Sequence, residues 1–303
     1  MTDKPKRADT EAYWASAVIG EGIRDAGNRR AFDNRTTAEI IAVYMECRRN
    51  DDATASLSTV HYRGGETEFR AGIQLLASNN PMERVVGADV LAQLGWRDRA
   101  FLDETVAALL SALSDQDVSV VQSAIFALGH RASPRAIPAL LPFVDHASTD
   151  LRYAVVHGLM PHDTPEVVEA LAKLSGDTDP DVRNWATFAL GSQLESDSHS
   201  LRKALRDRLA DSDPEVRGEA LVGLARRHDS SVATEVMREL ESDSYGGWAI
   251  EAAGLLGDAM FLSALRTLRR RLTGENAVLF RGGLEEAIAA CERRLLDDSP
   301  TLQ

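Results

Sequence analysis

The sequence is poor in cysteine, in aromatic residues and in long apolar runs, and each shortage excludes a class of protein. Its two cysteines, Cys47 and Cys291, each sit in an apolar helical pattern, so we expect small core residues rather than a disulfide framework. Aromatic residues make up 6% of the chain, which leaves little for base-stacking platforms or an aromatic-lined cofactor pocket. No apolar run approaches the roughly 18 residues of a membrane span, and no apolar signal region opens the chain. We therefore expect a cytoplasmic protein with no cofactor and no membrane partner.

Basic residues are scarce relative to acidic ones, so the chain has a formal net charge of -13. Such a charge repels nucleic acid and anionic membranes, so we expect no nucleic-acid partner. Many acids fall in predicted turns, where we interpret them as helix caps and solvated positions, with a functional acidic edge as the alternative. They are Asp115, Asp117, Asp177, Asp179, Asp181, Asp211, Asp213, Glu215, Glu241 and Asp243.

The chain does contain a phrase that recurs every thirty-odd residues. Its two clearest copies are Asp179-Pro180-Asp181-Val182-Arg183 and Asp213-Pro214-Glu215-Val216-Arg217, each followed by alanine and glycine at helical spacing. Counted on the arginine position, the steps from Val121 through Arg152, Arg183 and Arg217 to Ala249 are 31, 31, 34 and 32 residues. Self-similarity at this period indicates a solenoid with one helical hairpin per repeat.

Each phrase begins a helix by a simple mechanism: the aspartate caps it, proline takes the first helical position, and the next acid suits the positive helix end. Small apolar residues such as Val182 and Ala186 then share one face, and Gly129, Gly191 and Gly257 are expected to end these first helices. A second helix follows each turn, at roughly 103–113, 134–144, 165–174, 199–210, 230–240 and 259–272. The sequence predicts an all-α solenoid of such hairpins, wound as a right-handed superhelix.

The ends of the array have their own signals. We expect an N-terminal extension with a capping helix over 1–35, a solenoid over 36–296 and a C-terminal tail over 297–303. Thr36-Thr37-Ala38-Glu39 forms a capping box, and Tyr13 and Trp14 belong to a helix that covers the first repeat or hooks a partner. Residues 278–296 are expected to close the array with Leu279, Leu284, Ile288 and Leu295 inward.

Recurrent arginines allow two interpretations. Arg152, Arg183 and Arg217 either pair with aspartates of neighbouring turns, as repeated solenoid residues usually serve stacking, or form a ligand-binding row. A later run, Arg266 to Arg271, is interpreted as a solvated face, with a docking patch for an acidic partner as the alternative.

Catalytic and metal-binding motifs are missing from the sequence, with no Gly-x-Ser-x-Gly, His-Glu-x-x-His or P-loop pattern. His130, His162 and His228 fall near turns of different repeats, yet helices pack 8–10 Å apart while zinc needs nitrogens about 2.0–2.1 Å from one point. Asp177-Thr178-Asp179 resembles the start of a calcium loop but lacks its glycine and closing glutamate. We expect no metal site.

The hairpin with Asp-Pro-x-Val-Arg, then Ala, then Ala-Leu-Gly resembles the short HEAT-like repeats typified by phycobilin lyase subunits, over most of residues 53–296. The resemblance implies an interaction scaffold whose second helices line a concave surface. It also brings two enzyme-like relatives, the tetrapyrrole-handling bilin lyases and the HEAT-like DNA glycosylases or DNA-binding proteins. No catalytic motif of either transfers to these residues, and the acidic charge opposes DNA binding.

We therefore expect a non-enzymatic scaffold or adaptor that binds a protein partner along the concave face. Outward positions of the second helices supply the candidate contacts, namely Arg135, Glu166, Glu169, Lys173, Lys203, Asp207, Arg238, Arg266 and Arg269.

Overall fold

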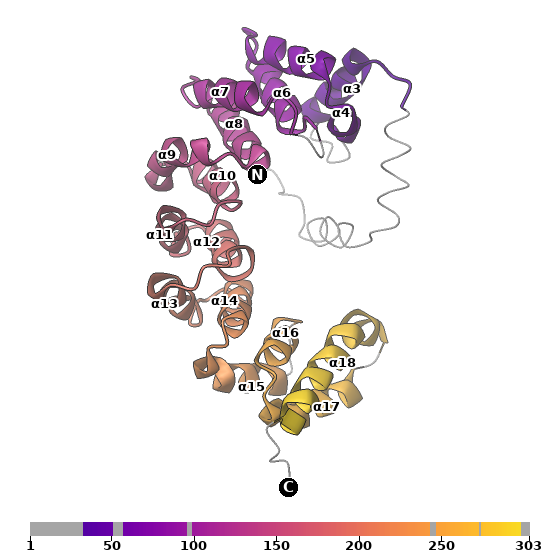
Figure 1. Cartoon of the computed structure of the whole chain (residues 1–303), viewed down its shortest axis with the longest axis vertical. Coiled ribbons are helices and arrows are strands. Elements are labelled where there is room, and N and C mark those ends of the chain that lie inside the picture. Colours follow the sequence, from indigo (N-terminus) through magenta and orange to yellow (C-terminus); the bar gives the residue numbers. More distant parts are fainter. Residues whose placement is uncertain (1–32, 51–56, 96–98, 243–246, 273, 298–303) are drawn as a thin grey trace. The chain divides into compact units, whose positions relative to one another are not determined.

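The computed structural model describes residues 33–50, 57–95, 99–242, 247–272 and 274–297, and within these ranges it consists of helices and turns (Figure 1). The predicted all-α solenoid is confirmed. The predicted N-terminal capping helix and most of the C-terminal tail lie outside the described residues. By their contacts the residues group into two compact units, Met1–Ser133 and Pro134–Gln303.

The first unit contains six described helices. They are α3 (Thr37–Arg49), α4 (Ser58–Arg63), α5 (Glu66–Leu76), α6 (Pro81–Ala92), α7 (Leu102–Ala112) and α8 (Val118–Arg131). The predicted capping box opens α3: the Thr36 hydroxyl accepts from the Glu39 amide at 3.2 Å, and the Glu39 carboxylate accepts from the Thr36 amide at 2.6 Å. Helices α5, α6 and α8 pack in sequence around fully buried Val86 and Leu91.

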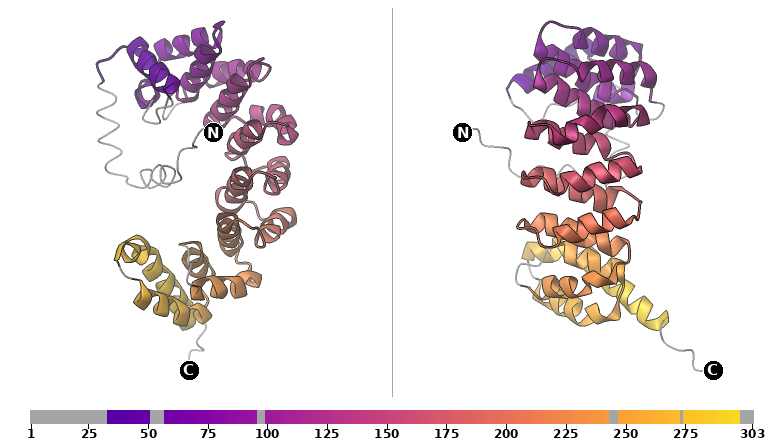
Figure 2. Two further views of the ribbon diagram at one scale, coloured as in Figure 1. Left: turned by 180° about the vertical axis from the view of Figure 1, so that it is seen from behind. Right: turned by 90° about the vertical axis from the view of Figure 1, so that its left-hand side faces the viewer.

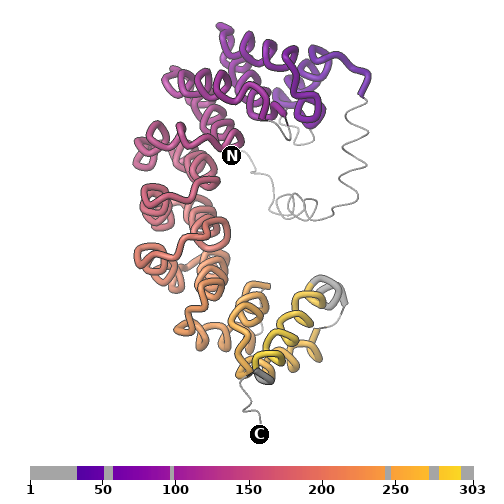
Figure 3. Tube along the Cα trace, in the orientation of Figure 1, coloured from indigo at the N-terminus to yellow at the C-terminus, as the bar shows by residue number. Residues whose placement is uncertain are grey.

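The second unit contains two rows of helices (Figures 2 and 3). The first helices of the repeats are α10 (Thr149–Leu159), α12 (Pro180–Phe188), α14 (Pro214–Arg226) and α16 (Gly247–Leu256), and the long α18 (Gly274–Asp297) continues their row. The second helices are α9 (Ile137–Leu140), α11 (Pro165–Leu174), α13 (His199–Arg208), α15 (Ala233–Glu241) and α17 (Leu262–Arg271). Short 3-10 turns precede or follow three of them, at Pro134–Ala136, Leu141–Asp145, Ser230–Val232 and Ala259–Phe261.

The repeated phrase begins helices as the sequence predicts. The Asp179 carboxylate accepts from the amides of Asp181 and Val182 at 3.0 and 3.2 Å, and the Asp213 carboxylate accepts from the Glu215 amide at 2.9 Å. In both helices proline follows the cap at the first position. The buried stripe of each first helix, such as Val182, Ala186 and Leu190, faces the leucines of the second helices.

The helix ends differ from the prediction at two of three glycines. Gly257, with φ of +62°, does follow the end of α16. Gly129 lies inside α8, which ends at Arg131 and is followed by the capping residue Ala132 with φ of 46°. Gly191 lies in a π-helical turn, Ala189–Gln193. The Arg227 guanidinium donates to the carbonyls of Leu190, Gly191 and Leu194 at this turn, and these bonds stabilise it. In the closing helix Leu284 and Ile288 are buried as predicted.

Candidate functional site

The nine predicted contact residues are all exposed, as expected of outward positions. Several are already engaged with neighbouring charges. Lys173 lies 2.6 Å from Asp145, Lys203 lies 2.5 Å from Asp207, and Arg266 and Arg269 lie 2.7 and 3.2 Å from Glu292 and Glu285. These pairs reduce the charge that the second helices present to a partner.

The placement of these residues on a concave surface was wrong for the second unit. Within this unit the row α10, α12, α14, α16 and α18 follows the inner side of the curve, and the second helices follow the outer side, as seen from the front and from behind (Figures 1 and 2). Arg135, Glu166, Glu169, Lys203 and Arg238 therefore belong to the outer row.

Small residues in the first helices give the physical reason for this curvature. A Cβ atom added to Gly223 would lie 2.5 Å from the Gly191 Cα atom, and one added to Gly254 would lie 3.1 Å from the Ala287 Cα atom. Backbones that approach so closely shorten the spacing along the first-helix row, so the array bends toward it. Gly218 similarly leaves room for the Trp248 indole ring.

An array of aromatic side chains lies on this inner row. The ring centroids of Tyr153 and His157 are 4.8 Å apart, those of His157 and Trp185 4.7 Å, and those of Trp185 and Phe188 5.6 Å. All four rings are partly exposed and lie on the side of α10 and α12 away from the buried stripe. Both tryptophans of the described chain, Trp185 and Trp248, are on this row.

Carboxylates accompany the rings. The Trp248 indole N–H donates to a Glu219 oxygen at 3.0 Å, and the Asn184 amide donates to a Glu215 oxygen at 3.3 Å. Burial raises the pKa of Glu219 to about 7, and the nearby carboxylates of Glu251 and Glu215 also raise it. The hydrogen bond from Trp248 and the charge of Arg226 lower this pKa, but by less. We define the first-helix face as Tyr153, His157, Trp185, Phe188, Glu219 and Trp248.

The recurrent arginines follow the stacking interpretation. Arg152 forms a two-bond ion pair with Asp177, at 2.6 and 2.8 Å, and Arg183 forms another with Asp211, at 3.0 and 3.2 Å. Each also donates to backbone carbonyls of the turn before its own helix. Arg217 donates to the carbonyls of Asp211 and Ser212 at 2.8 and 3.1 Å. These groups join neighbouring repeats.

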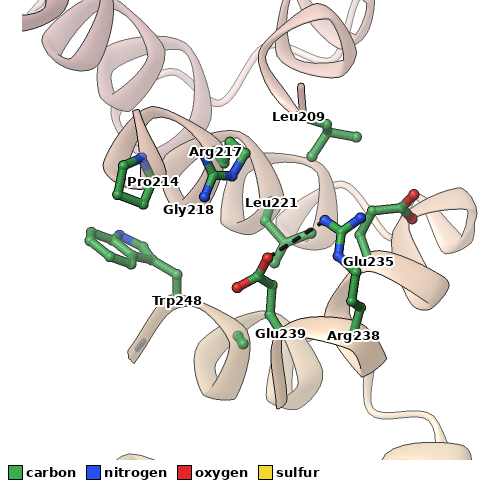
Figure 4. A pocket seen from close by; sticks show the side chains of 10 residues that line it. Leu209, Pro214, Arg217, Gly218, Leu221, Glu235, Arg238, Glu239 and Trp248 are labelled. Carbon is green, nitrogen blue, oxygen red and sulfur yellow. Dashed lines mark ion pairs between the residues drawn. The ribbon is translucent and has the colours of Figure 1, made fainter. Parts of the chain in front are cut away.

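Figure 4 shows a small cavity between α14, α15 and α16, with a volume of about 60 Å³. Leu221 and Trp248 form apolar walls, and Arg238 lies 3.5 Å from Glu239 at the rim. A volume of this size holds a few water molecules. A larger open groove of about 570 Å³ runs between α16 and α18, past Gly254, Ala287 and Phe280.

The remaining sequence candidates are separated or buried. His162 is buried, whereas His130 and His228 are exposed, and the described ranges hold no group of three histidine, cysteine or acidic residues arranged to bind a metal ion. Cys47 is partly exposed, whereas Cys291 is buried, and burial raises the pKa of the Cys291 thiol to about 11. Among the described helices, none is both long and apolar enough to cross a membrane.

Sequence reasoning missed the first-helix face, although a signal for it was present. His157 and Phe188 occupy the same position of successive repeats, 31 residues apart, and Tyr153 and Trp185 flank them on the same helices. Aromatic residues that recur at the repeat period in a chain with so few of them mark a surface, not a core.

Known proteins share this architecture. Protein YibA of Escherichia coli strain K12 is 27% identical over 259 residues, which cover 78% of this chain and 91% of YibA. The X-ray structure of E. coli YibA matches with a TM-score of 0.64 and 24% identity, covering 97% of this chain and 99% of that one, so the two share a fold. The complex of CpcE and CpcF of phycocyanin lyase from Nostoc sp. PCC7120 matches with a TM-score of 0.40 and 22% identity over 51% of this chain and 96% of that one, which is too low to imply a shared activity.

A family model of HEAT repeats matches three overlapping stretches, residues 72–158, 106–191 and 169–253. Together the stretches span more than half of the chain and coincide with the stacked hairpins of α5 to α16. The chain therefore belongs to the HEAT repeat family.

Proposed function

We propose that this chain is a HEAT-repeat scaffold that binds a protein partner on its first-helix face. The observation that carries the proposal is the array of four partly exposed rings, Tyr153, His157, Trp185 and Phe188, which continues across two repeats. Tryptophan and tyrosine dominate the energetically important residues of protein interfaces, because they bury much apolar area at low entropic cost. The curvature toward this row supports the proposal, since it lets neighbouring repeats contact one partner.

We further propose that the chain acts as an adaptor without chemistry of its own, in the cytoplasm. The thiol of Cys291 is buried and its raised pKa keeps it protonated at neutral pH, so it is a poor nucleophile. A buried thiol outside any disulfide, such as that of Cys291, suits a reducing compartment.

Affinity capture from the host with matched variants tests the proposal. Replacing both Trp185 and Phe188 with alanine should reduce recovery of the partner at least about tenfold, as expected for two interface anchors. The matched control reverses the charges of Glu169 and Lys173 on the second helices and should leave recovery unchanged. Circular dichroism must show that both variants keep the helical content of the parent.

The opposite pattern would move the partner to the outer row, where Arg135, Glu166, Glu169, Lys173, Lys203, Asp207, Arg238, Arg266 and Arg269 would be its contacts. Recovery that neither variant changes would contradict binding at either surface. The tetrapyrrole alternative has a separate readout, because a bound bilin would give the purified protein visible absorbance.

A further inference from the structure

Every first helix of the second unit that contributes to the first-helix face also carries at least one acidic residue. Asp150 and Asp181 lie on α10 and α12, Glu215 and Glu219 on α14, and Glu251 on α16. The Asp181 carboxylate interacts electrostatically with Tyr153. The carboxylates of Glu215 and Glu251 interact in the same way with Glu219, which accepts from the Trp248 ring. A cation at this face would meet aromatic faces and carboxylates together.

Three arginines of the same helices are directed to the turns between repeats, whereas a fourth, Arg226, pairs with Glu251. Arg152 and Arg183 bind Asp177 and Asp211 in the turns between repeats, and Arg217 binds carbonyls of such a turn. Arg226, near the end of α14, lies 3.2 Å from Glu251. Three of these arginines thus serve the turns between repeats, and Arg226 offsets part of the negative charge of Glu251.

We propose that the partner docks on the first-helix face through an extended basic segment whose arginine side chains stack on the rings and pair with the carboxylates. This inference rests on the proposed function and names its partner chemistry. A guanidinium is planar, so it can stack flat on an aromatic ring while its N–H groups reach a carboxylate, whereas an ammonium group has no flat face to stack. The net charge of -13 steers such a segment toward the chain.

The helix spacing sets the spacing of the arginines. Packed helices lie about 8–10 Å apart, and a polyproline II segment advances about 3.1 Å per residue with about three residues per turn. One helix therefore corresponds to about three residues of such a segment, and every third side chain lies on the same side of it. A segment with arginine at every third residue would present one guanidinium to each of α10, α12, α14 and α16.

The test measures fluorescence anisotropy of labelled peptides with the full-length protein. The probe is a peptide of five Arg-Gly-Ser triplets, and its comparison peptides carry lysine or aspartate in place of arginine. The arginine peptide should bind, its affinity should fall as salt is raised, the lysine peptide should bind more weakly, and the aspartate peptide should not bind.

Two variants of the protein locate the site. Glu219→Gln keeps an oxygen that accepts from Trp248, so it preserves the local fold. At pH 8, where the Glu219 carboxyl with its pKa of about 7 is mostly ionised, the substitution should weaken binding of the arginine peptide about five- to tenfold. Trp185→Leu should weaken it by a similar factor through loss of stacking. Glu169→Gln removes the same charge from the outer row and should have no effect.

Equal binding of the arginine and aspartate peptides, or no binding of either, would overturn the inference. So would equal weakening by Glu219→Gln and Glu169→Gln, because it would reduce the effect to net charge. A captured partner that depends on Trp185 and Phe188 but is not displaced by the arginine peptide would leave the proposed function intact and refute the basic segment.

Discussion

At the scale of single residues, the molecule separates two uses of charge. Ion pairs in the turns between repeats are largely shielded from water, with the side chains of Arg183 and Asp211 only 14% and 5% exposed. Pairs on the outer row, such as Lys173 with Asp145, are 61% and 69% exposed. Shielding decides which pair affects stability, since water and salt screen an exposed pair.

Replacing Arg183 with methionine should lower the free energy of unfolding by about 2–4 kcal/mol. It removes the two-bond partner of the Asp211 carboxylate, which keeps only Arg208 at 3.4 Å and the Asp213 amide, and it leaves two turn carbonyls without the Arg183 donor. Urea denaturation followed by circular dichroism measures the change. Lys173→Met is the control and should change stability by less than about 1 kcal/mol. Equal losses in the two variants would show that shielding is not the deciding factor.

The raised pKa of Glu219 predicts a dependence of stability on pH. Between its ordinary value of 4.5 and its folded value of about 7, the folded chain binds more protons at this group than the unfolded chain does. The contribution of Glu219 is therefore present below pH 4.5 and is lost as the pH rises through about 7. Glu219→Gln should consequently gain stability relative to the parent at pH 8 compared with pH 5, measured by urea denaturation at both pH values. An equal difference at both would contradict the assignment.

At the scale of helices, close backbone approach in the inner row sets how repeats stack. Gly191 and Gly223 face each other across the contact of the π-helical turn with α14, and the Arg227 guanidinium binds carbonyls on both sides. A side chain of any size there would force the two backbones apart.

Gly223→Ala should destabilise the protein by about 2–4 kcal/mol, because the new methyl would collide with the Gly191 backbone, which cannot rotate away. Gly282→Ala in α18 is the matched control. Its added methyl meets no atom within 4 Å, so it should stabilise the helix by about 0.5–1 kcal/mol through helix propensity. Thermal melts of both variants measure the shifts, and a neutral Gly223→Ala would refute the close approach.

The sequence predicted helices well because their signals are local. Asp179 and Asp213 cap, prolines follow them, and the second helices lie within a few residues of the expected ranges. Which row is inner depends on the contact between repeats, where Gly191 meets Gly223, and no single helix encodes that. The glycines at these positions were a signal of close packing between first helices. Our expectation that the second helices line the concave surface did not take them into account. The Arg227 network was equally out of reach, since it joins residues more than thirty positions apart.

At the scale of the whole molecule, the net charge leads us to expect no nucleic-acid partner. The net charge of the chain is -13. In α17, which carries the run Arg266 to Arg271, Arg266 and Arg269 already pair with Glu292 and Glu285. We expect no salt-dependent binding of duplex DNA in an anisotropy titration, because few cations remain to replace counterions on the phosphates. Binding that is lost when Arg266, Arg269 and Arg270 are replaced would overturn this expectation.

The turns between repeats also have a mechanical consequence. Asp177 accepts from Arg152 through its carboxylate and from Arg183 through its carbonyl, and Asp211 does the same for Arg183 and Arg217. Each aspartate is therefore bound both to the repeat before it and to the repeat after it. A pull along the row would load these contacts in series, and parting one repeat from the next would require an ion pair and a carbonyl contact to break together. This edge of the second unit would behave as a chain under tension, yielding one repeat at a time.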